Sequence, residues 1–160
     1  MATVYLCLGS NLGDRIKQFQ SAQIEIGKNI GKILIKSSVY DTEPWGLSVD
    51  ESFLNQVLIV ESTLEPEMLL DECLEIEKKH GRVRDSLVYE SRTLDIDLLF
   101  YDNEIINSNK LTLPHPQIAN RKFVLEPLCE ISPEFIHPLL KRSLSELLYS
   151  CQDEMKVKKL

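Results

Sequence analysis

Residues 92–100 read Arg92-Thr93-Leu94-Asp95-Ile96-Asp97-Leu98-Leu99-Phe100, an apolar segment interrupted by two carboxylates. Alternating polar and apolar residues at its start predict a short β-strand. Side chains at positions i and i+2 of a strand share a face, which would place Asp95 and Asp97 roughly 6 to 7 Å apart. Magnesium ions prefer carboxylate oxygens, and in two-metal phosphoryl chemistry they lie about 3.5 to 4 Å apart. The pair therefore suggests a site for magnesium and a polyphosphate.

An alternative is that Asp95 and Asp97 merely face solvent on an edge strand. In that case Leu94, Ile96, Leu98 and Phe100 would point into the core. The sequence around the strand favours binding, because residues 81–91 form a helix-to-strand connection of a length common in binding loops.

The elements upstream of this strand define the fold class. Strand-like runs occupy residues 4–8, 32–40 and 53–61, and the turn-rich residues 9–14 precede a helix marked by Ile16, Phe19, Ile24 and Ile26. A second helix begins near Pro66 and stops at Gly81. The resulting order predicts an α+β fold with a ferredoxin-like βαββαβ core. From Pro114 onward we expect a helical or irregular segment that wraps the sheet, within a single domain of residues 1–160.

Composition limits the classes of function. A net charge of −7 disfavours general binding to nucleic acid or to membrane surfaces, which requires a broad basic surface. Positive charge is instead local, before the aspartates at Lys78, Lys79, Arg82, Arg84 and Arg92 and after them at Lys110, Arg121 and Lys122. The four cysteines are widely spaced, which predicts reduced, structural thiols. The first residues carry no recognisable targeting segment, so we expect a cytoplasmic protein.

Several polar residues could contact a phosphate ligand. Arg82, Arg84 and Arg92 offer always-charged donor forks suited to phosphate oxygens, although most arginines only decorate surfaces. His115 lies between two prolines that restrict its backbone, so its ring could donate to a phosphate oxygen. His80 and His137 are better explained as surface or capping residues.

A second group could hold a flat heterocycle. Asn55 lies on an apolar strand face, where its amide either satisfies a backbone group or reads a donor and acceptor edge. Phe53, Tyr89 and Phe123 could supply stacking walls, although aromatic residues are more often part of the core. The loop of residues 9–13 lacks the spacing of a Walker or dinucleotide fingerprint, so a strained turn explains its glycines.

Together these motifs resemble the 6-hydroxymethyl-7,8-dihydropterin pyrophosphokinase family over nearly the whole chain. The resemblance rests on residues 8–14, 40–46, 53–55, 77–84, 92–99, 113–116 and 121–125. It implies a ferredoxin-like fold and two magnesium ions. It also implies transfer of pyrophosphate from ATP to the pterin hydroxymethyl group, with release of AMP, in folate biosynthesis. Many members have Arg-Trp-Gly-Pro-Arg where this chain has Val88-Tyr89-Glu90-Ser91-Arg92.

The resemblance also implies roles for individual residues. Asp95 and Asp97 resemble the ligands of both magnesium ions, and they form the catalytic group together with Arg82 and Arg92. The positions that resemble ATP contacts are Glu77, Arg84, Leu98, Lys110, Thr112, His115 and Arg121. The positions that resemble pterin contacts are Thr42, Pro44, Gly46, Phe53, Asn55, Tyr89 and Phe123. We expect the loops of residues 43–52 and 82–91 to close over the reactants, and the enzyme to act as a monomer.

Two other functions remain open from the sequence. A ligand-sensing or scaffold domain would bind without forming AMP, because ferredoxin-like folds often bind without catalysis. A nucleotidyl transferase would release pyrophosphate instead of AMP.

Overall fold

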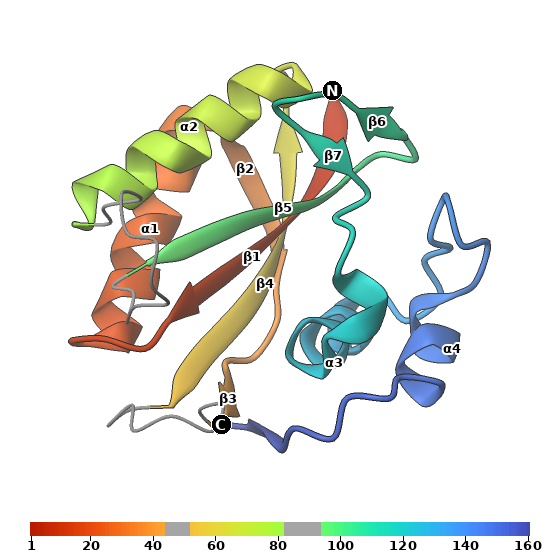
Figure 1. Ribbon diagram of the computed structural model, residues 1–160. Coiled ribbons are helices and arrows are strands. Elements are labelled where there is room, and N and C mark those ends of the chain that lie inside the picture. The colour runs from red at the N-terminus through yellow and green to blue at the C-terminus, as the bar shows by residue number, and fades with distance from the viewer. Residues whose placement is uncertain (44–51, 82–93) are drawn as a thin grey trace.

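A computed structural model describes residues 1–43, 52–81 and 94–160. The chain forms an antiparallel sheet with helices on both faces (Figure 1). The strands of the main sheet are β1 (Ala2–Ser10), β2 (Gly31–Lys36), β3 (Tyr40–Thr42), β4 (Phe53–Ser62), β5 (Asp95–Tyr101) and β8 (Val157–Lys159). A separate pair consists of β6 (Ile106–Asn107) and β7 (Thr112–Leu113). The helices are α1 (Arg15–Asn29), α2 (Pro66–Lys79), the 3-10 turn η1 (Ile118–Asn120), α3 (Lys122–Ile131) and α4 (Leu144–Tyr149).

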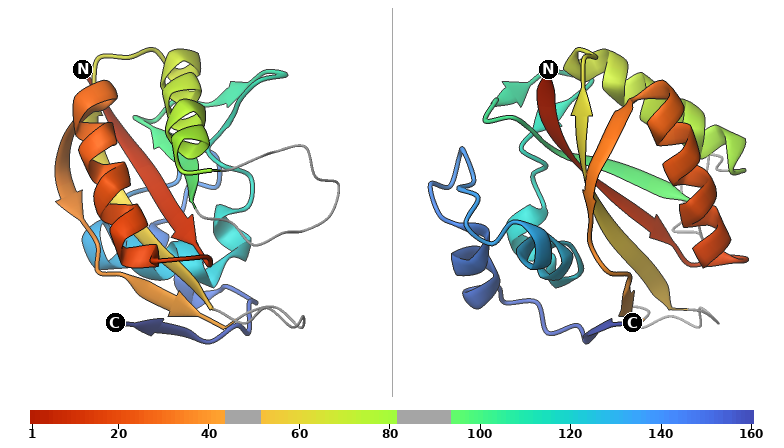
Figure 2. Two further views of the ribbon diagram at one scale, coloured as in Figure 1. Left: turned by 90° about the vertical axis from the view of Figure 1, so that its left-hand side faces the viewer. Right: turned by 180° about the vertical axis from the view of Figure 1, so that it is seen from behind.

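The main sheet follows the order β5-β1-β4-β3-β8, and β2 pairs with the other half of β4 on the same side as β3. The helices α1 and α2 cover one face, while α3 and α4 lie on the other, as the views of Figure 2 confirm. The expected mixed α and antiparallel β architecture is thus confirmed. No helix in the described residues is long and apolar enough to cross a membrane.

Each sheet face has its own core. Phe19 and Ile26 of α1 pack with Leu69 and Ile76 of α2 against the first face. Val124, Leu125 and Leu128 of α3 pack with Leu144 and Leu147 of α4 against the second. Burying such large apolar side chains supplies most of the folding free energy, roughly 1.5 to 3 kcal/mol for each one. The sheet therefore lies between two apolar layers.

Three expectations about elements need correction. The run of residues 32–40 is two strands, β2 and β3, because at Ser37 the side-chain hydroxyl, in place of a backbone carbonyl, accepts the hydrogen bond from Val57 N. Phe100 does not share a face with Leu94, Ile96 and Leu98, because the β1–β5 register shifts between Tyr5 and Leu6. The tail from Pro114 contains η1, α3 and α4, and it also adds strand β8 to the sheet.

Candidate active site

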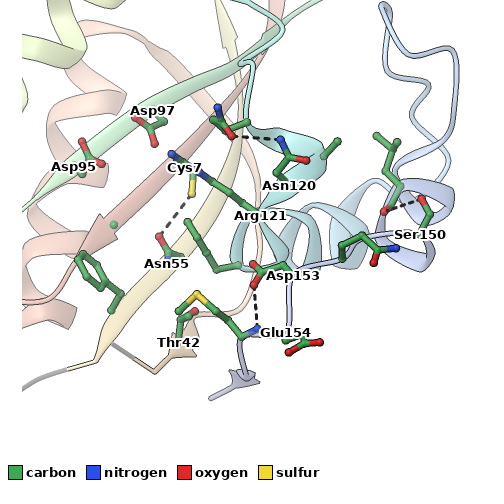
Figure 3. Close-up of a pocket in the computed structure, with 18 of the residues that line it drawn as sticks. Cys7, Thr42, Asn55, Asp95, Asp97, Asn120, Arg121, Ser150, Asp153 and Glu154 are labelled. Atoms are coloured by element: carbon green, nitrogen blue, oxygen red, sulfur yellow. Dashed lines mark hydrogen bonds between the residues drawn. The ribbon is translucent and has the colours of Figure 1, made fainter. Parts of the chain in front are cut away.

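A cavity opens on the second face of the sheet, where β1, β3, β4 and β5 meet the start of α3. Its volume is about 1360 Å³. Seven residues that the sequence pointed to line it: Thr42, Phe53, Asn55, Asp95, Asp97, Arg121 and Phe123. Figure 3 shows Asp95 and Asp97 side by side on one strand, with Asn55 and Arg121 facing the same hollow. Residues distant in sequence therefore converge at one site.

Strand register explains how the aspartates meet Asn55. Gly9 of β1 pairs with Asp95 on one side and with Asn55 on the other. Adjacent strands lie about 4.8 Å apart, so Asp95 and Asn55, on either side of Gly9, lie at roughly twice that spacing from each other. A Cβ at Gly9 would approach Asn55 Oδ1 at 3.0 Å and Asp95 Cβ at 3.8 Å. Because Gly9 has no side chain, its backbone forms the floor of the cavity between the two polar groups.

Cys7 also forms part of this floor, in the next row toward the core. It pairs with Asp97 across β1 and β5, and its Sγ lies 4.0 Å from Asn55 Oδ1. Burial raises the pKa of the Cys7 thiol well above its usual value, and the nearby carboxylates Asp97 and Asp95 raise it further. The thiol is thus protonated at neutral pH and is a poor nucleophile.

Hydrogen bonds along its free edge hold the aspartate strand β5, which is the end strand of the sheet. Glu77 of α2 is 1% exposed, and its Oε2 accepts a hydrogen bond of 2.8 Å from Ile96 N, the residue between the two aspartates. Farther along β5, His115 N donates to Leu99 O at 3.0 Å. These bonds fix the backbone of β5, and hence the direction in which Asp95 and Asp97 project.

The residues at the start of α3 form the opposite wall. The guanidinium carbon of Arg121 lies 5.7 Å from the centre of the Phe123 ring, a cation–π arrangement. His115 interacts electrostatically with both Arg121 and Asp95. Burial is the larger cause and the Arg121 charge the smaller cause of a lowered His115 pKa, and the Asp95 carboxylate opposes this shift. Its Nδ1 accepts from Gln117 N at 3.1 Å, which leaves Nε2 to carry the proton of the neutral ring.

Thr42 contributes an unsatisfied polar group to the cavity. The residue is 2% exposed, and its Oγ1 has no hydrogen-bond partner among the described residues. Buried hydroxyls normally have partners, because an unpaired one costs free energy. A polar ligand in the cavity could satisfy it.

Other predicted positions lie elsewhere. Glu77, Leu98, Lys110, Thr112 and His115 are not among the described cavity-lining residues. Leu98 is buried in the first core, and the Lys110 ammonium pairs with Asp71 Oδ1 at 2.8 Å. Six further positions lie outside the described residues: Pro44, Gly46, Arg82, Arg84, Tyr89 and Arg92. The expected closure of the loops at 43–52 and 82–91 likewise concerns segments that are almost wholly outside them.

The sequence did not single out several residues of the cavity. Gly9 stood in a motif interpreted as a strained turn, whereas only Gly13 there has a positive φ, of 73°. Cys7 was interpreted only as a structural thiol, and all four cysteines are indeed free. Gln117 and residues 152–155 carry no motif. Their place in the cavity follows from tertiary packing.

The two aspartates suit a magnesium ion, which takes few protein ligands. Magnesium is usually bound through one or two carboxylates together with waters and substrate phosphates. Asp95 and Asp97 are partly exposed at the cavity and supply hard oxygen donors. The part of the chain that the structure describes has no group of three or more His, Cys, Asp or Glu side chains that would form an all-protein metal cage.

Comparison with known proteins gives one consistent result. Residues 5–133 match the family model of 7,8-dihydro-6-hydroxymethylpterin-pyrophosphokinase (HPPK). The 2-amino-4-hydroxy-6-hydroxymethyldihydropteridine pyrophosphokinase of Aquifex aeolicus is 41% identical over 148 residues, which cover 91% of this chain and 90% of that protein. The enzyme of the same name from Haemophilus influenzae is 38% identical, with 99% of this chain and 98% of that protein covered.

Longer proteins contain a similar region. The folic acid synthesis protein fol1 of Pneumocystis carinii is 40% identical, and the match covers 89% of this chain but 19% of that protein. Solved structures show the same fold. An HPPK-DHPS crystal structure in complex with substrates has a TM-score of 0.75 at 14% identity, covering 93% of this chain. Plasmodium falciparum HPPK-DHPS has a TM-score of 0.72 at 17% identity. This chain spans 43% of the length of each of these two solved chains.

Proposed function

The chain belongs to the 7,8-dihydro-6-hydroxymethylpterin-pyrophosphokinase family, and from this premise we propose that the cavity is where ATP meets the pterin. It is a pyrophosphokinase of folate biosynthesis. It transfers pyrophosphate from ATP to the hydroxymethyl group of 6-hydroxymethyl-7,8-dihydropterin and releases AMP. The placement of both substrates in this cavity rests on one observation: Asp95, Gly9 and Asn55 lie side by side on the adjacent strands β5, β1 and β4.

In this proposal the pterin lies over Gly9, with its edge toward Asn55 and its ring between Phe53 and Phe123. The Asn55 amide offers both a donor and an acceptor, as the pterin edge requires. The Thr42 hydroxyl, which has no hydrogen-bond partner among the described residues, lines the same cavity and supports a polar ligand there. Pro44, Gly46 and Tyr89 are proposed to complete the pterin site, as the family resemblance implies.

On the other side of Gly9, Asp95 and Asp97 are proposed to hold two magnesium ions, which when bound would neutralise the phosphate charge. Arg121 and His115 are proposed to contact the phosphates, together with Arg82, Arg84 and Arg92. Leu98, Lys110 and Thr112 are proposed for the adenosine end. Glu77 is proposed to act on the nucleotide through β5, because its carboxylate holds the backbone between the aspartates.

The reaction requires mainly alignment and charge neutralisation. The pterin hydroxyl oxygen forms a bond to the β-phosphorus of ATP, and the bond from that phosphorus to the oxygen shared with the α-phosphate breaks. AMP leaves with the electron pair, and the hydroxyl proton passes to solvent. Phosphoryl-type transfer gains most from in-line positioning and fixed positive charge, so arginines and a rigid floor suffice without a strong base.

We also propose that the core is ferredoxin-like, with a C-terminal segment added to a single domain of residues 1–160. The sheet path, in which β1 lies between β5 and β4, supports this topology. We further propose a monomeric cytoplasmic enzyme without affinity for nucleic acid or membranes. Its net charge of −7 supports the absence of such binding.

The test is a product analysis with magnesium-ATP and 6-hydroxymethyl-7,8-dihydropterin that resolves AMP, ADP and pyrophosphate. We expect AMP only when the pterin is present. A double Asp95→Ala/Asp97→Ala variant should remain folded and lose turnover by more than about 100-fold, because charge stabilisation is the main catalytic contribution. Release of pyrophosphate would indicate nucleotidyl transfer, and no turnover by folded protein would indicate a binding module.

A further inference from the structure

Residues 152–155, between α4 and β8, line the cavity although the proposed reaction assigns them no role. Asp153, Met155 and Val157 are half-buried, whereas Gln152, Glu154 and Lys156, which alternate with them, are exposed. This alternation is that of an extended segment with one side turned inward. Figure 3 shows Asp153 in the part of the cavity between Arg121 and Thr42.

The Asp153 carboxylate joins two backbone segments. Its Oδ2 accepts a hydrogen bond of 3.0 Å from Lys122 N, and its Oδ1 accepts one of 3.0 Å from Met155 N. Lys122 is the first residue of α3, and the N-cap residue Arg121 makes no side-chain cap hydrogen bond. The first N–H groups of a helix have no partner within the helix. Asp153 supplies one from 31 residues further along the chain.

This bond lies next to two side chains of the cavity. Lys122 lies between Arg121 and Phe123, both of which line the cavity. The backbone of Arg121 is held by a different hydrogen bond, in which its N–H donates to Ile118 O at 3.3 Å. Phe123 follows Lys122 in α3, so the bond at Lys122 acts on the helix start that carries the Phe123 ring.

The second bond acts on the other wall. It orders the turn from Asp153 to Met155, after which β8 pairs with β3 so that Val157 lies opposite Thr42. One carboxylate thus connects the strand that carries Thr42 to the helix that carries Phe123.

We propose that Asp153 is a positioning residue for the pterin, which sets the distance between the Phe123 wall and the Thr42 wall. The inference rests on the proposed function, because it assumes that the pterin lies between these walls. A simple helix cap would add stability alone, whereas a positioning residue also controls the affinity for the pterin.

The experiment compares Asp153→Ala and Asp153→Asn with Ser143→Ala. Ser143 caps α4 through a capping box, so its loss is a matched loss of a helix cap in the same half of the chain. We expect Asp153→Ala to raise the KM for the pterin about tenfold and the KM for magnesium-ATP less than about threefold. Asp153→Asn keeps one acceptor and should raise the pterin KM about twofold. Ser143→Ala should lower the Tm to a similar degree and leave both KM values unchanged.

An unchanged pterin KM in Asp153→Ala, with a Tm loss like that of Ser143→Ala, would overturn the proposal. Equal effects of the Ala and Asn variants would also overturn it, because the hydrogen bond would then not be the cause. If Asp153→Ala is recovered unfolded, the pterin KM of Asp153→Asn tests the proposal instead, and a wild-type value in that variant contradicts it.

Hydrogen exchange of residues 119–125 without ligand should be faster in either variant. Hydrogen exchange does not depend on turnover. A failure of the proposed function would appear as no AMP from the wild type, and it can therefore be distinguished from a failure of the role proposed for Asp153.

Discussion

The glycine at position 9 shows how far a single missing side chain shapes this cavity. Gly9 separates Asn55 from Asp95 in the sheet, and its Cα is the floor between the groups proposed to hold the two substrates. Asn55, Asp95 and Asp97 could be predicted from the sequence, because polar residues on an apolar strand face require partners. Gly9 and Cys7 could not, because their importance arises from which strands become neighbours.

Gly9→Ala tests the open floor. The new methyl group would approach Asn55 Oδ1 at 3.0 Å and force the amide to move. We expect a pterin KM raised about tenfold, with unfolding free energy reduced by about 1 kcal/mol. Steady-state kinetics and denaturant unfolding measure the two quantities.

Gly27→Ala is the matched control, because a Cβ at Gly27 in α1 would meet nothing within 4 Å. Alanine in a helix interior should raise the unfolding free energy by about 1 kcal/mol and leave the kinetics unchanged. A Gly9→Ala enzyme with wild-type pterin KM would contradict the proposed place of the pterin.

Among the elements, β5 combines the chemistry of the site with an unusual attachment. A strand that carries two carboxylates on one face gains less from burial, and here α2 compensates by hydrogen bonding to the backbone of β5 through Glu77. A buried carboxylate on a helix is costly unless it is paired. Its bond to the backbone of β5 places Asp95 and Asp97 at a fixed position in the cavity.

Glu77→Ala should therefore affect both stability and turnover. The loss leaves Ile96 N without its acceptor in a buried position, which costs about 1 to 3 kcal/mol. We expect kcat to fall at least about tenfold as the aspartates lose alignment. Glu77→Gln keeps a carbonyl acceptor and should retain most of both properties. Denaturant unfolding and AMP release measure the effects, and wild-type turnover in the Ala variant would show that β5 does not need this contact.

Some helices and strands could be predicted from the sequence and others could not. The helix α2 was predictable because Pro66 marks its start and Gly81, with a φ of 84°, follows its end. Strand β8 was not predictable, because Val157, Lys158 and Lys159 carry little apolar pattern. The strand is held by backbone pairing with β3 and by the ion pair between Lys159 and Glu130 of α3. The split between β2 and β3 depends on Ser37, whose hydroxyl accepts from Val57 N at 2.9 Å, a contact with a distant residue.

For the whole molecule, the histidines link stability to pH. His137 is 4% exposed, and its Nδ1 accepts from Leu139 N at 3.2 Å and from Leu140 N at 3.0 Å. Burial lowers the pKa of His137 below its usual 6.5, and burial together with Arg121 does the same to the pKa of His115. In the unfolded chain both rings take up protons near pH 6.5, before they do so in the folded protein.

Stability should therefore be complete above pH 6.5 and decline as the pH falls toward the lowered pKa values. We expect the Tm to drop by a few degrees between about pH 7 and pH 5.5. His137→Asn retains an acceptor without titrating in this range, so its Tm should depend less on pH. Thermal unfolding across the range is the measurement, and an equal slope in the variant would exclude His137 as a source.

The hydrogen bonds that orient β5 have a second consequence, for solubility. A strand at the end of a sheet exposes backbone groups on which a second molecule can add a strand and begin aggregation. At the β5 end, Ile96 N is occupied by Glu77 and Leu99 O by the backbone of His115. At the opposite end, β8 carries the charge of Lys158, which disfavours pairing with a like strand, while the Lys159 ammonium is paired with Glu130. The attachments that align the site thus also protect the sheet from edge-to-edge polymerisation.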